Sequence, residues 1–265
     1  MTTTNTKIII VLAVAGGLIV FGTNFLPDLI QEESEKTVSV GYHYETSFQI
    51  GRPSQPANQK SMASSFSLGG DEQFITSNPV DLSQINRISK FRSCIGHDYS
   101  GTNSEGQQES NRSMKHYVEP INSLAGTSGK LQVFAPFDGK ITQAKSEGRG
   151  QQVWISTSNG WHFIFFHVDL LEQFSVGSSV NSGEHIGYAN LLMGAANFDI
   201  GLKQFGPGNQ VFNSPFLYMD SAVLDEYLEK GLTPEDVIIS KFERDSSPCN
   251  FAEESYDERE FVELI

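Results

Sequence analysis

The order of hydrophobic and polar positions separates an apolar start, a polar stretch and a long region of short alternating runs. Residues 8–27 carry no charge and are mostly apolar. A helix of this length measures about 30 Å, the thickness of a bilayer core. Residues 31–80 are polar, with Ser, Gly and Pro in clusters typical of loops and one alternating run at 37–48 that predicts a strand. The pattern predicts one transmembrane helix followed by a stalk.

The clearest strand pattern lies between residues 131 and 189. Turn dipeptides interrupt it at 138–139, 159–160 and 182–183, and the Asn-Gly pair at 159–160 is the strongest hairpin signal. Short strands at this regular spacing predict a mainly β protein, an antiparallel β sandwich or barrel-sandwich hybrid with short flanking helices. The segments with the strand pattern are 131–136, 140–146, 151–158, 161–168 and 178–189.

Helix signals flank this β region. Asp81 is a suitable N-cap for a short helix over 82–91, and Asp220 or Ser221 is suitable for a helix that ends at Gly231. Residues 237–242 have the composition of a last strand. The predicted organisation is a membrane anchor over 1–30, a polar stalk over 31–80, a β domain with a C-terminal helix over 81–250, and an acidic tail over 251–265.

The net charge limits the kinds of partner that the protein can bind, and the charges around the apolar run predict its orientation in the membrane. The chain has 32 acidic and 18 basic residues, a net charge of −14, which argues against nucleic acid because phosphate binding needs clustered Lys and Arg. Lys7 precedes the apolar run, whereas Asp28 and Glu32 follow it. The positive-inside tendency therefore predicts a single-pass protein with a cytoplasmic N-terminus and an extracytoplasmic C-terminal domain. A cleaved signal peptide is the alternative.

The two cysteines, Cys94 and Cys249, lie far apart in the sequence. An even number of cysteines in an exported domain favours a disulfide between them. Two unpaired thiols are the alternative. The predicted bond would close a very long loop, which adds stability in the chain-entropy model.

Four segments, taken in order, resemble the lysostaphin/LytM-type zinc metallopeptidases, cell-wall endopeptidases built on the duplicated hybrid motif. They are VFAPFDGKI at 133–141, WHFIFFHVDL at 161–170, GSSVNSGEHIGYA at 177–189 and AANFDI at 195–200. The resemblance implies a β fold of the LytM type. It also implies a zinc site that takes two ligands from an upstream H-x-x-x-D and one from the second His of H-x-H.

The departures from that family concern the metal. Ala195 and Asn197 stand at the two positions of H-x-H, and Asp199 stands where the family has Glu. Upstream, the segment KHYVEP offers His116 and Glu119 as candidate metal ligands, three residues apart instead of four. On an extended strand this spacing turns the two side chains to opposite faces unless a bulge realigns them.

The remaining candidate residues follow from the same resemblance. His167 matches a catalytic histidine of the family and is the predicted remnant of the catalytic site. Phe163, Phe165 and Asn197 are predicted to line a remnant groove. A second candidate ligand group, His97 with Asp98, is disfavoured because adjacent strand residues point to opposite faces.

These observations predict a membrane-anchored, extracytoplasmic LytM-like domain that does not catalyse hydrolysis. We expect it to bind or organise a cell-envelope polymer or an envelope protein, with no cofactor. The first alternative is an active zinc metalloendopeptidase with a rearranged metal site, in which zinc would be the cofactor. The second alternative is a structural spacer between envelope layers, which need not retain any partner.

Overall fold

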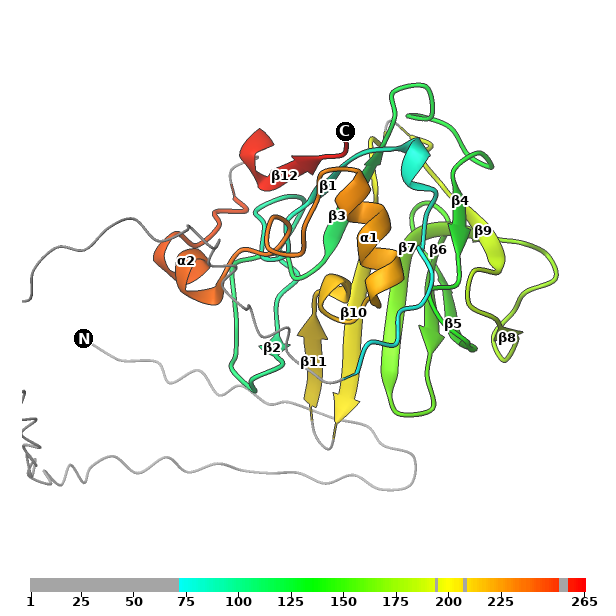
Figure 1. The fold of residues 1–265 in the computed structure, drawn as a ribbon, viewed down its shortest axis with the longest axis horizontal. Coiled ribbons are helices and arrows are strands. Elements are labelled where there is room, and N and C mark those ends of the chain that lie inside the picture. The colour runs from blue at the N-terminus through cyan, green and yellow to red at the C-terminus, as the bar shows by residue number, and fades with distance from the viewer. Residues whose placement is uncertain (1–71, 194, 207–208, 253–256) are drawn as a thin grey trace, which may run out of the picture. The chain divides into compact units, whose positions relative to one another are not determined.

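The computed structural model describes residues 72–193, 195–206, 209–252 and 257–265 (Figure 1). The membrane span predicted at 8–27 and the strand predicted at 37–48 lie outside the described residues. Within the described ranges, no helix combines the length and the apolar character needed to cross a membrane.

Strands are the main regular elements of the described chain. Their bounds are β1 Ile85–Ser89, β2 Thr102–Asn103, β3 His116–Pro120, β4 Gln132–Phe134, β5 Gly139–Ser146, β6 Gln151–Ser156, β7 Trp161–Leu170, β8 Ser179–Val180, β9 His185–Ala189, β10 Phe198–Gly206, β11 Asn209–Asn213 and β12 Phe261–Glu263. Eight of them follow the order β12-β1-β3-β10-β7-β6-β5-β8, while β11 pairs with β10 and β9 pairs with β7 and β4. Every one of these pairs is antiparallel; the added pair of β11 with β2 is parallel. The predicted mainly β, antiparallel fold is confirmed.

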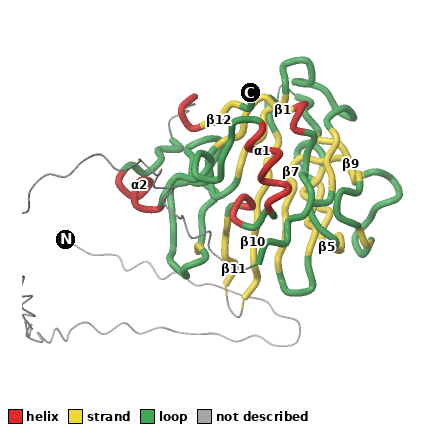
Figure 2. The backbone as a smooth tube through the Cα atoms, viewed as in Figure 1, coloured by secondary structure: helices red, strands yellow, loops and turns green. Residues whose placement is uncertain are grey.

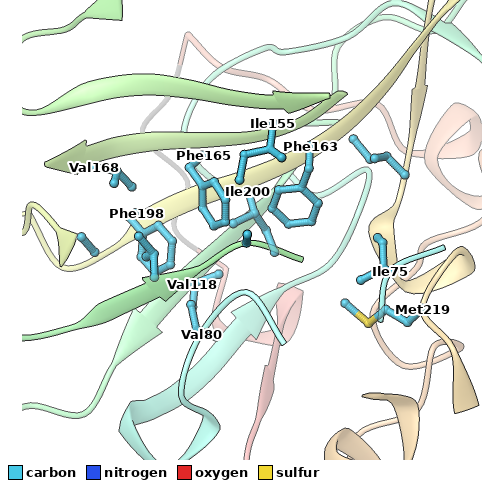
Figure 3. Packing of buried hydrophobic residues seen from close by; sticks show 14 of the residues in the cluster. Ile75, Val80, Val118, Ile155, Phe163, Phe165, Val168, Phe198, Ile200 and Met219 are labelled. Carbon is cyan, nitrogen blue, oxygen red and sulfur yellow. The ribbon is translucent and has the colours of Figure 1, made fainter. Parts of the chain in front are cut away.

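The core covers one face of the central strands. Phe163 and Phe165 of β7, together with Phe198 and Ile200 of β10, are at most 1% exposed and point to the same side as Ile155 of β6 (Figure 3). Alternate positions on each strand account for this, because every second side chain projects from the same face.

The helices are few and short (Figure 2). They are the 3-10 turns η1 Leu82–Gln84, η2 Pro215–Leu217 and η3 Glu258–Glu260, and the α-helices α1 Ser221–Glu229 and α2 Lys241–Ser246. Helix α1 begins as predicted, because the Asp220 side chain accepts a hydrogen bond from the Val223 amide. Its Tyr227 is buried against Phe216, with ring centroids 4.9 Å apart.

The strand predictions between 131 and 189 are confirmed by β4 to β9. The Asn-Gly pair lies in the β6–β7 hairpin, where Gly160 adopts a φ of +90° that an L side chain rarely adopts. Local turn chemistry therefore located these elements correctly.

Three other predictions need correction. Asp81 does cap a helical turn, but η1 ends at Gln84 and residues 85–89 of the predicted helix form β1, which pairs with β3 and β12. Residues 237–242 form only an isolated bridge of Ile238 with Phe91 before α2 begins. The segment predicted as an acidic tail contains β12, which pairs with β1 and extends the sheet. This pairing buries Phe261.

Candidate functional site

Strands β3 and β10 build the part of the sheet where the resemblance places the metal. Their register pairs Tyr117 with Asp199 and Val118 with Phe198. Val118 and Phe198 lie in the core, so Tyr117 and Asp199 project from the opposite side. We call this opposite side of the sheet the outer face.

Lys115 directly precedes β3 and forms a buried ion pair on the outer face. It is 2% exposed, and its Nζ lies 2.5 Å from Asp199 Oδ2 and 3.3 Å from His97 Nε2. Burial acts to lower the pKa of Lys115, but the Asp199 carboxylate outweighs this and the net pKa is raised. Three rings lie near the ammonium, with centroids at 4.9 Å for Tyr99, 4.9 Å for Tyr117 and 4.5 Å for Phe166.

Lys115 and Glu119 have the spacing of the family's upstream metal motif. They are four residues apart, as H-x-x-x-D requires, and an even spacing on a strand places both on the outer face. An ammonium has no lone pair for a metal, and Glu119 Oε2 accepts a hydrogen bond from Arg87 Nε at 2.6 Å.

These positions do not fit zinc. Catalytic zinc sites take three protein ligands with nitrogen, sulfur or carboxylate donors, whereas this chain places Lys115, Glu119 and Asn197 there. Across the described ranges, no three His, Cys, Asp or Glu side chains are grouped so that they could hold a metal ion.

His116, the predicted partner of Glu119 as a metal ligand, lies on the core side instead. The ring is fully buried, and Nδ1 donates to the Ser89 carbonyl at 2.7 Å. Nε2 therefore accepts from the Ser214 hydroxyl at 2.8 Å. The predicted pairing of His116 with Glu119 is corrected, because β3 pairs with β10 without a register shift and the two side chains point to opposite faces.

The buried His116 makes stability depend on pH. Burial lowers the pKa of His116, and the hydrogen bond to the Ser89 carbonyl offsets only part of this effect, so the pKa is about 4. Between pH 6.5 and 4 the unfolded chain binds a proton that the folded chain does not, so stability falls as pH falls through this window. The expected loss is about 3 kcal/mol. Urea unfolding from pH 7 to 4 measures it, and His116→Gln should remove this part of the slope. An unchanged slope in the variant would contradict the assignment.

His167, the predicted catalytic remnant, lies at an irregularity of β7. Between Phe165 and Val168, β7 has one residue more than β6 opposite, and His167 adopts a φ of +61°. Its Nδ1 is 3.1 Å from Glu147 Oε2 and 3.3 Å from the Arg149 carbonyl, and its side chain is 25% exposed. The bulge aims the ring at the loop between β5 and β6.

The groove prediction is wrong for Phe163 and Phe165. Both are fully buried in the core, and it is Ile164 and Phe166 that project from the outer face. The sequence run is apolar at every one of these positions, so hydrophobicity alone does not say which alternate set faces the core.

The backbone carbonyl of Asn197 accepts a hydrogen bond at the candidate site. Arg149, from the β5–β6 loop, donates to this carbonyl at 2.7 Å and also to the carbonyl of Asn190. Burial lowers the pKa of Arg149, while nearby Asp199 and Glu147 act to raise it. No sequence pattern predicts Arg149, because the family's motifs contain metal ligands and catalytic histidines but no arginine in this loop.

Tyr99 covers the outer face above the Lys115–Asp199 pair. Its ring meets Phe166 and Phe212 edge to face, at 5.5 and 5.3 Å. The Lys203 ammonium is 4.9 Å from the same ring. Burial, together with the charge of Lys115, lowers the pKa of Lys203 to about 8. We call residues 94–112, which carry Tyr99, the covering segment.

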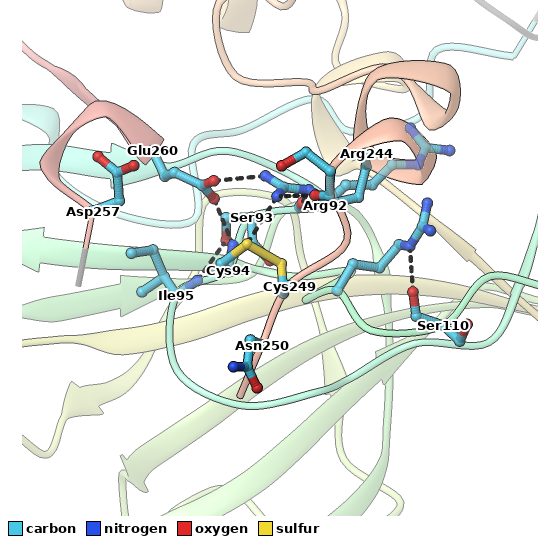
Figure 4. The surroundings of a disulfide bond; sticks show 12 residues. Arg92, Ser93, Cys94, Ile95, Ser110, Arg244, Cys249, Asn250, Asp257 and Glu260 are labelled. Carbon is cyan, nitrogen blue, oxygen red and sulfur yellow. Dashed lines mark hydrogen bonds and ion pairs between the residues drawn. A yellow bond between two sulfur atoms is a disulfide. The ribbon is translucent and has the colours of Figure 1, made fainter. Parts of the chain in front are cut away.

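The covering segment is fastened at its start by the predicted disulfide, which is confirmed. Cys94 and Cys249 are bonded, and Arg244 donates to Glu260 beside them (Figure 4). Further along, Glu109 accepts from Arg92 and Arg112. Burial acts to raise the pKa of Glu109, but these two guanidinium groups outweigh it and the net pKa is lowered.

Comparison with known proteins agrees with this geometry. Residues 121–198 match the family model described as peptidase family M23, which confirms the resemblance to LytM-type peptidases for this segment. The match begins after Lys115 and Glu119 and ends just past Asn197. No curated protein matches the chain.

Several solved structures are similar at low identity. A chain described as a glycyl-glycine endopeptidase LytM from Ruminococcus gnavus is 17% identical over 39% of this chain, with a TM-score of 0.33. This chain covers 44% of that one, less than half of its length. The SpoIIQ–SpoIIIAH pore-forming complex gives 16% identity over 61% of this chain and 100% of that chain, with a TM-score of 0.41. Csd3 from Helicobacter pylori gives 16% over 72% of this chain and 47% of that chain, with a TM-score of 0.39.

Proposed function

We propose that this protein is a membrane-anchored, extracytoplasmic envelope protein whose M23-like domain binds a cell-envelope polymer without cleaving it. Residues 8–27 supply the anchor in this proposal, with the N-terminus in the cytoplasm. The observation that carries the proposal is the buried ion pair of Lys115 with Asp199 at 2.5 Å, formed by a lysine whose spacing of four from Glu119 matches the family's upstream metal motif.

The Lys115 ammonium disfavours the binding of a metal ion at the same place. Two positive charges a few ångströms apart repel, and the repulsion is strongest where water is excluded. Lys115 is 2% exposed, so its charge is poorly screened. Asp199, which could otherwise offset the charge of a metal ion, already bonds the ammonium. Zinc would have to break this pair and leave Lys115 buried without a counterion.

The surroundings also support binding over catalysis. Tyr99 lies over the Lys115–Asp199 pair, and Arg149 holds the chain at Asn197 and Asn190. A hydrolase of this type needs an open metal position for water. Here the Tyr99 ring lies 4.9 Å from the Lys115 ammonium on the outer face.

A combined sedimentation, metal and hydrolysis assay tests the proposal. Full-length protein is mixed with purified insoluble envelope polymer, and an active zinc endopeptidase serves as the positive control for cleavage. We expect co-sedimentation with the polymer, no released fragments, and no effect of added zinc or chelator. Stoichiometric zinc with chelator-sensitive fragment release would instead establish the zinc metalloendopeptidase. Failure to sediment with the polymer would overturn the proposal in favour of a protein partner or a spacer.

A further inference from the structure

Three rings gather on the outer face, where the Lys203 ammonium lies 5.6 Å from Trp154 and 4.9 Å from Tyr99 of the covering segment. Trp154 of β6, His162 of β7 and Phe205 of β10 contact one another, with centroids 5.4 Å apart for Trp154 and His162 and 4.6 Å for His162 and Phe205. The core lies on the other face of these strands, so polar side chains would ordinarily stand here. Phe205 is nevertheless 40% exposed. We call these three residues the ring cluster.

Side-chain amides border the ring cluster. Gln152 Oε1 accepts from Trp154 Nε1 at 2.9 Å and from Gln143 Nε2 at 2.7 Å. A glutamine side chain offers two donors and an acceptor with two lone pairs, which is more than these bonds use. Both glutamines are only partly buried. The ring cluster therefore has hydrogen-bonding groups at its edge.

A cavity of about 610 Å³ opens next to the ring cluster, at the ends of β5, β6 and β8. Most of its exposed lining surface is apolar, and hydroxyl groups come from Thr142, Ser156, Thr157, Ser158 and Ser179. Asp138 and Lys140 contribute one charge of each sign.

Hydrogen bonds link the cavity to the rings. The Ser156 hydroxyl is 2.5 Å from Thr142 Oγ1 and 2.6 Å from His162 Nδ1. Ser156 is only 8% exposed, so these bonds fix its position. Ser156 and Trp154 are two residues apart on β6 and share the outer face. The hydroxyl cavity and the ring cluster thus form one continuous surface.

We propose that this continuous surface binds a neutral oligosaccharide, with a sugar ring stacked on Trp154 or Phe205 and its hydroxyls bonded in the cavity. The apolar C–H face of a pyranose matches an aromatic ring, while its equatorial hydroxyls need donors and acceptors around that ring. Ligand sites combine apolar walls with a few placed polar groups in this size range. This inference rests on the proposed function and specifies which part of the polymer is recognised.

Charge favours a neutral sugar over a phosphate-bearing polymer. The chain carries a net charge of −14, which repels a polyanion over distances up to the screening length. The cavity itself is balanced by Asp138 and Lys140. Hydroxyl and amide groups recognise other hydroxyls without requiring charge.

Tryptophan fluorescence gives a direct test, because the two tryptophans differ in environment. Trp161 is 4% exposed and packs against Tyr218, whereas Trp154 lies on the partly exposed outer face. Full-length protein, purified without sugar-based detergent, is titrated with chitotetraose, cellotetraose and tetra-alanine. We expect a saturable change in emission with at least one tetrasaccharide and none with the peptide.

Variants locate the site. Trp154→Ala should abolish the emission change and weaken tetrasaccharide binding, measured by calorimetry, by about tenfold. Gln143→Ala combined with Gln152→Ala should also weaken binding, and it leaves the rings in place if Trp154→Ala fails to fold. Phe242→Ala is the matched control, because Phe242 is an aromatic residue that is 83% exposed on α2.

The outcomes separate this inference from the proposed function. No binding of either tetrasaccharide at millimolar concentration, or equal binding by wild type and both site variants, would overturn the saccharide site. If wild type and site variants then sediment equally with the envelope polymer, the proposed function stands and only the location is wrong. Loss of polymer sedimentation in the site variants, but not in Phe242→Ala, supports both.

Discussion

Replacing Lys115 by methionine should destabilise the domain by about 3–5 kcal/mol at pH 7, because it leaves a buried carboxylate without its counterion. Asp199 is 2% exposed, and Lys115 Nζ is its ion-pair partner at 2.5 Å. Methionine keeps most of the volume of the lysine chain, so the loss reports charge more than packing. Urea unfolding of wild type and variant under identical salt conditions measures the difference.

A double substitution tests whether the loss of stability comes from the unpaired charge of Asp199. Replacing both residues, Lys115→Met with Asp199→Leu, removes both buried charges and should recover most of the lost stability. Lys145→Met is the control, since Lys145 is exposed on β5, and it should change stability by less than about 0.5 kcal/mol. If Lys115→Met proved as stable as Lys145→Met, the buried ion pair would not be a structural substitute for the metal.

This pair links two neighbouring strands of the sheet. An ammonium on the residue before β3 neutralises Asp199 on β10, so β3 and β10 are held together by charge as well as by their backbone hydrogen bonds.

Much of the fold could be predicted because its signals are local. The Asn-Gly turn and the alternating runs fix β5, β6 and β7 within short stretches of sequence. Strand β1 escaped prediction because its conformation is fixed by β3 and β12, which are distant in sequence. Asp81 gives a real N-cap signal there, but sheet pairing ends the helical turn after three residues.

The candidate site could be predicted only in part. Motif order predicts that Asn197 and His167 lie near each other, and both contact Arg149. Residue type favours His116 as a ligand, whereas a spacing of four favours Lys115 and Glu119. Arg149 and Tyr99 come from connecting segments, and no spacing rule says where such segments fold back onto a sheet.

Removing the disulfide, by Cys94→Ser combined with Cys249→Ser, should lower the free energy of unfolding by up to about 5 kcal/mol in the chain-entropy model. The two cysteines are separated by 155 positions, so the bond restricts most of the described chain in its unfolded state. Urea unfolding of the double variant gives the value, and reduced wild type should match it. A loss below about 1 kcal/mol would mean that the unfolded chain is already compact.

The same variant should loosen the covering segment more than the sheet. The amide of Met114 bonds the Tyr99 carbonyl, and the amide of Cys249 bonds the carbonyl of Asn111, so both report on this segment. Hydrogen exchange at these amides should accelerate in the double variant, while exchange at Ile164 in β7 should change only with global stability. Equal acceleration at all three would contradict a local fastening role. Selective acceleration would show that the disulfide holds the segment that carries Tyr99 over the Lys115–Asp199 pair.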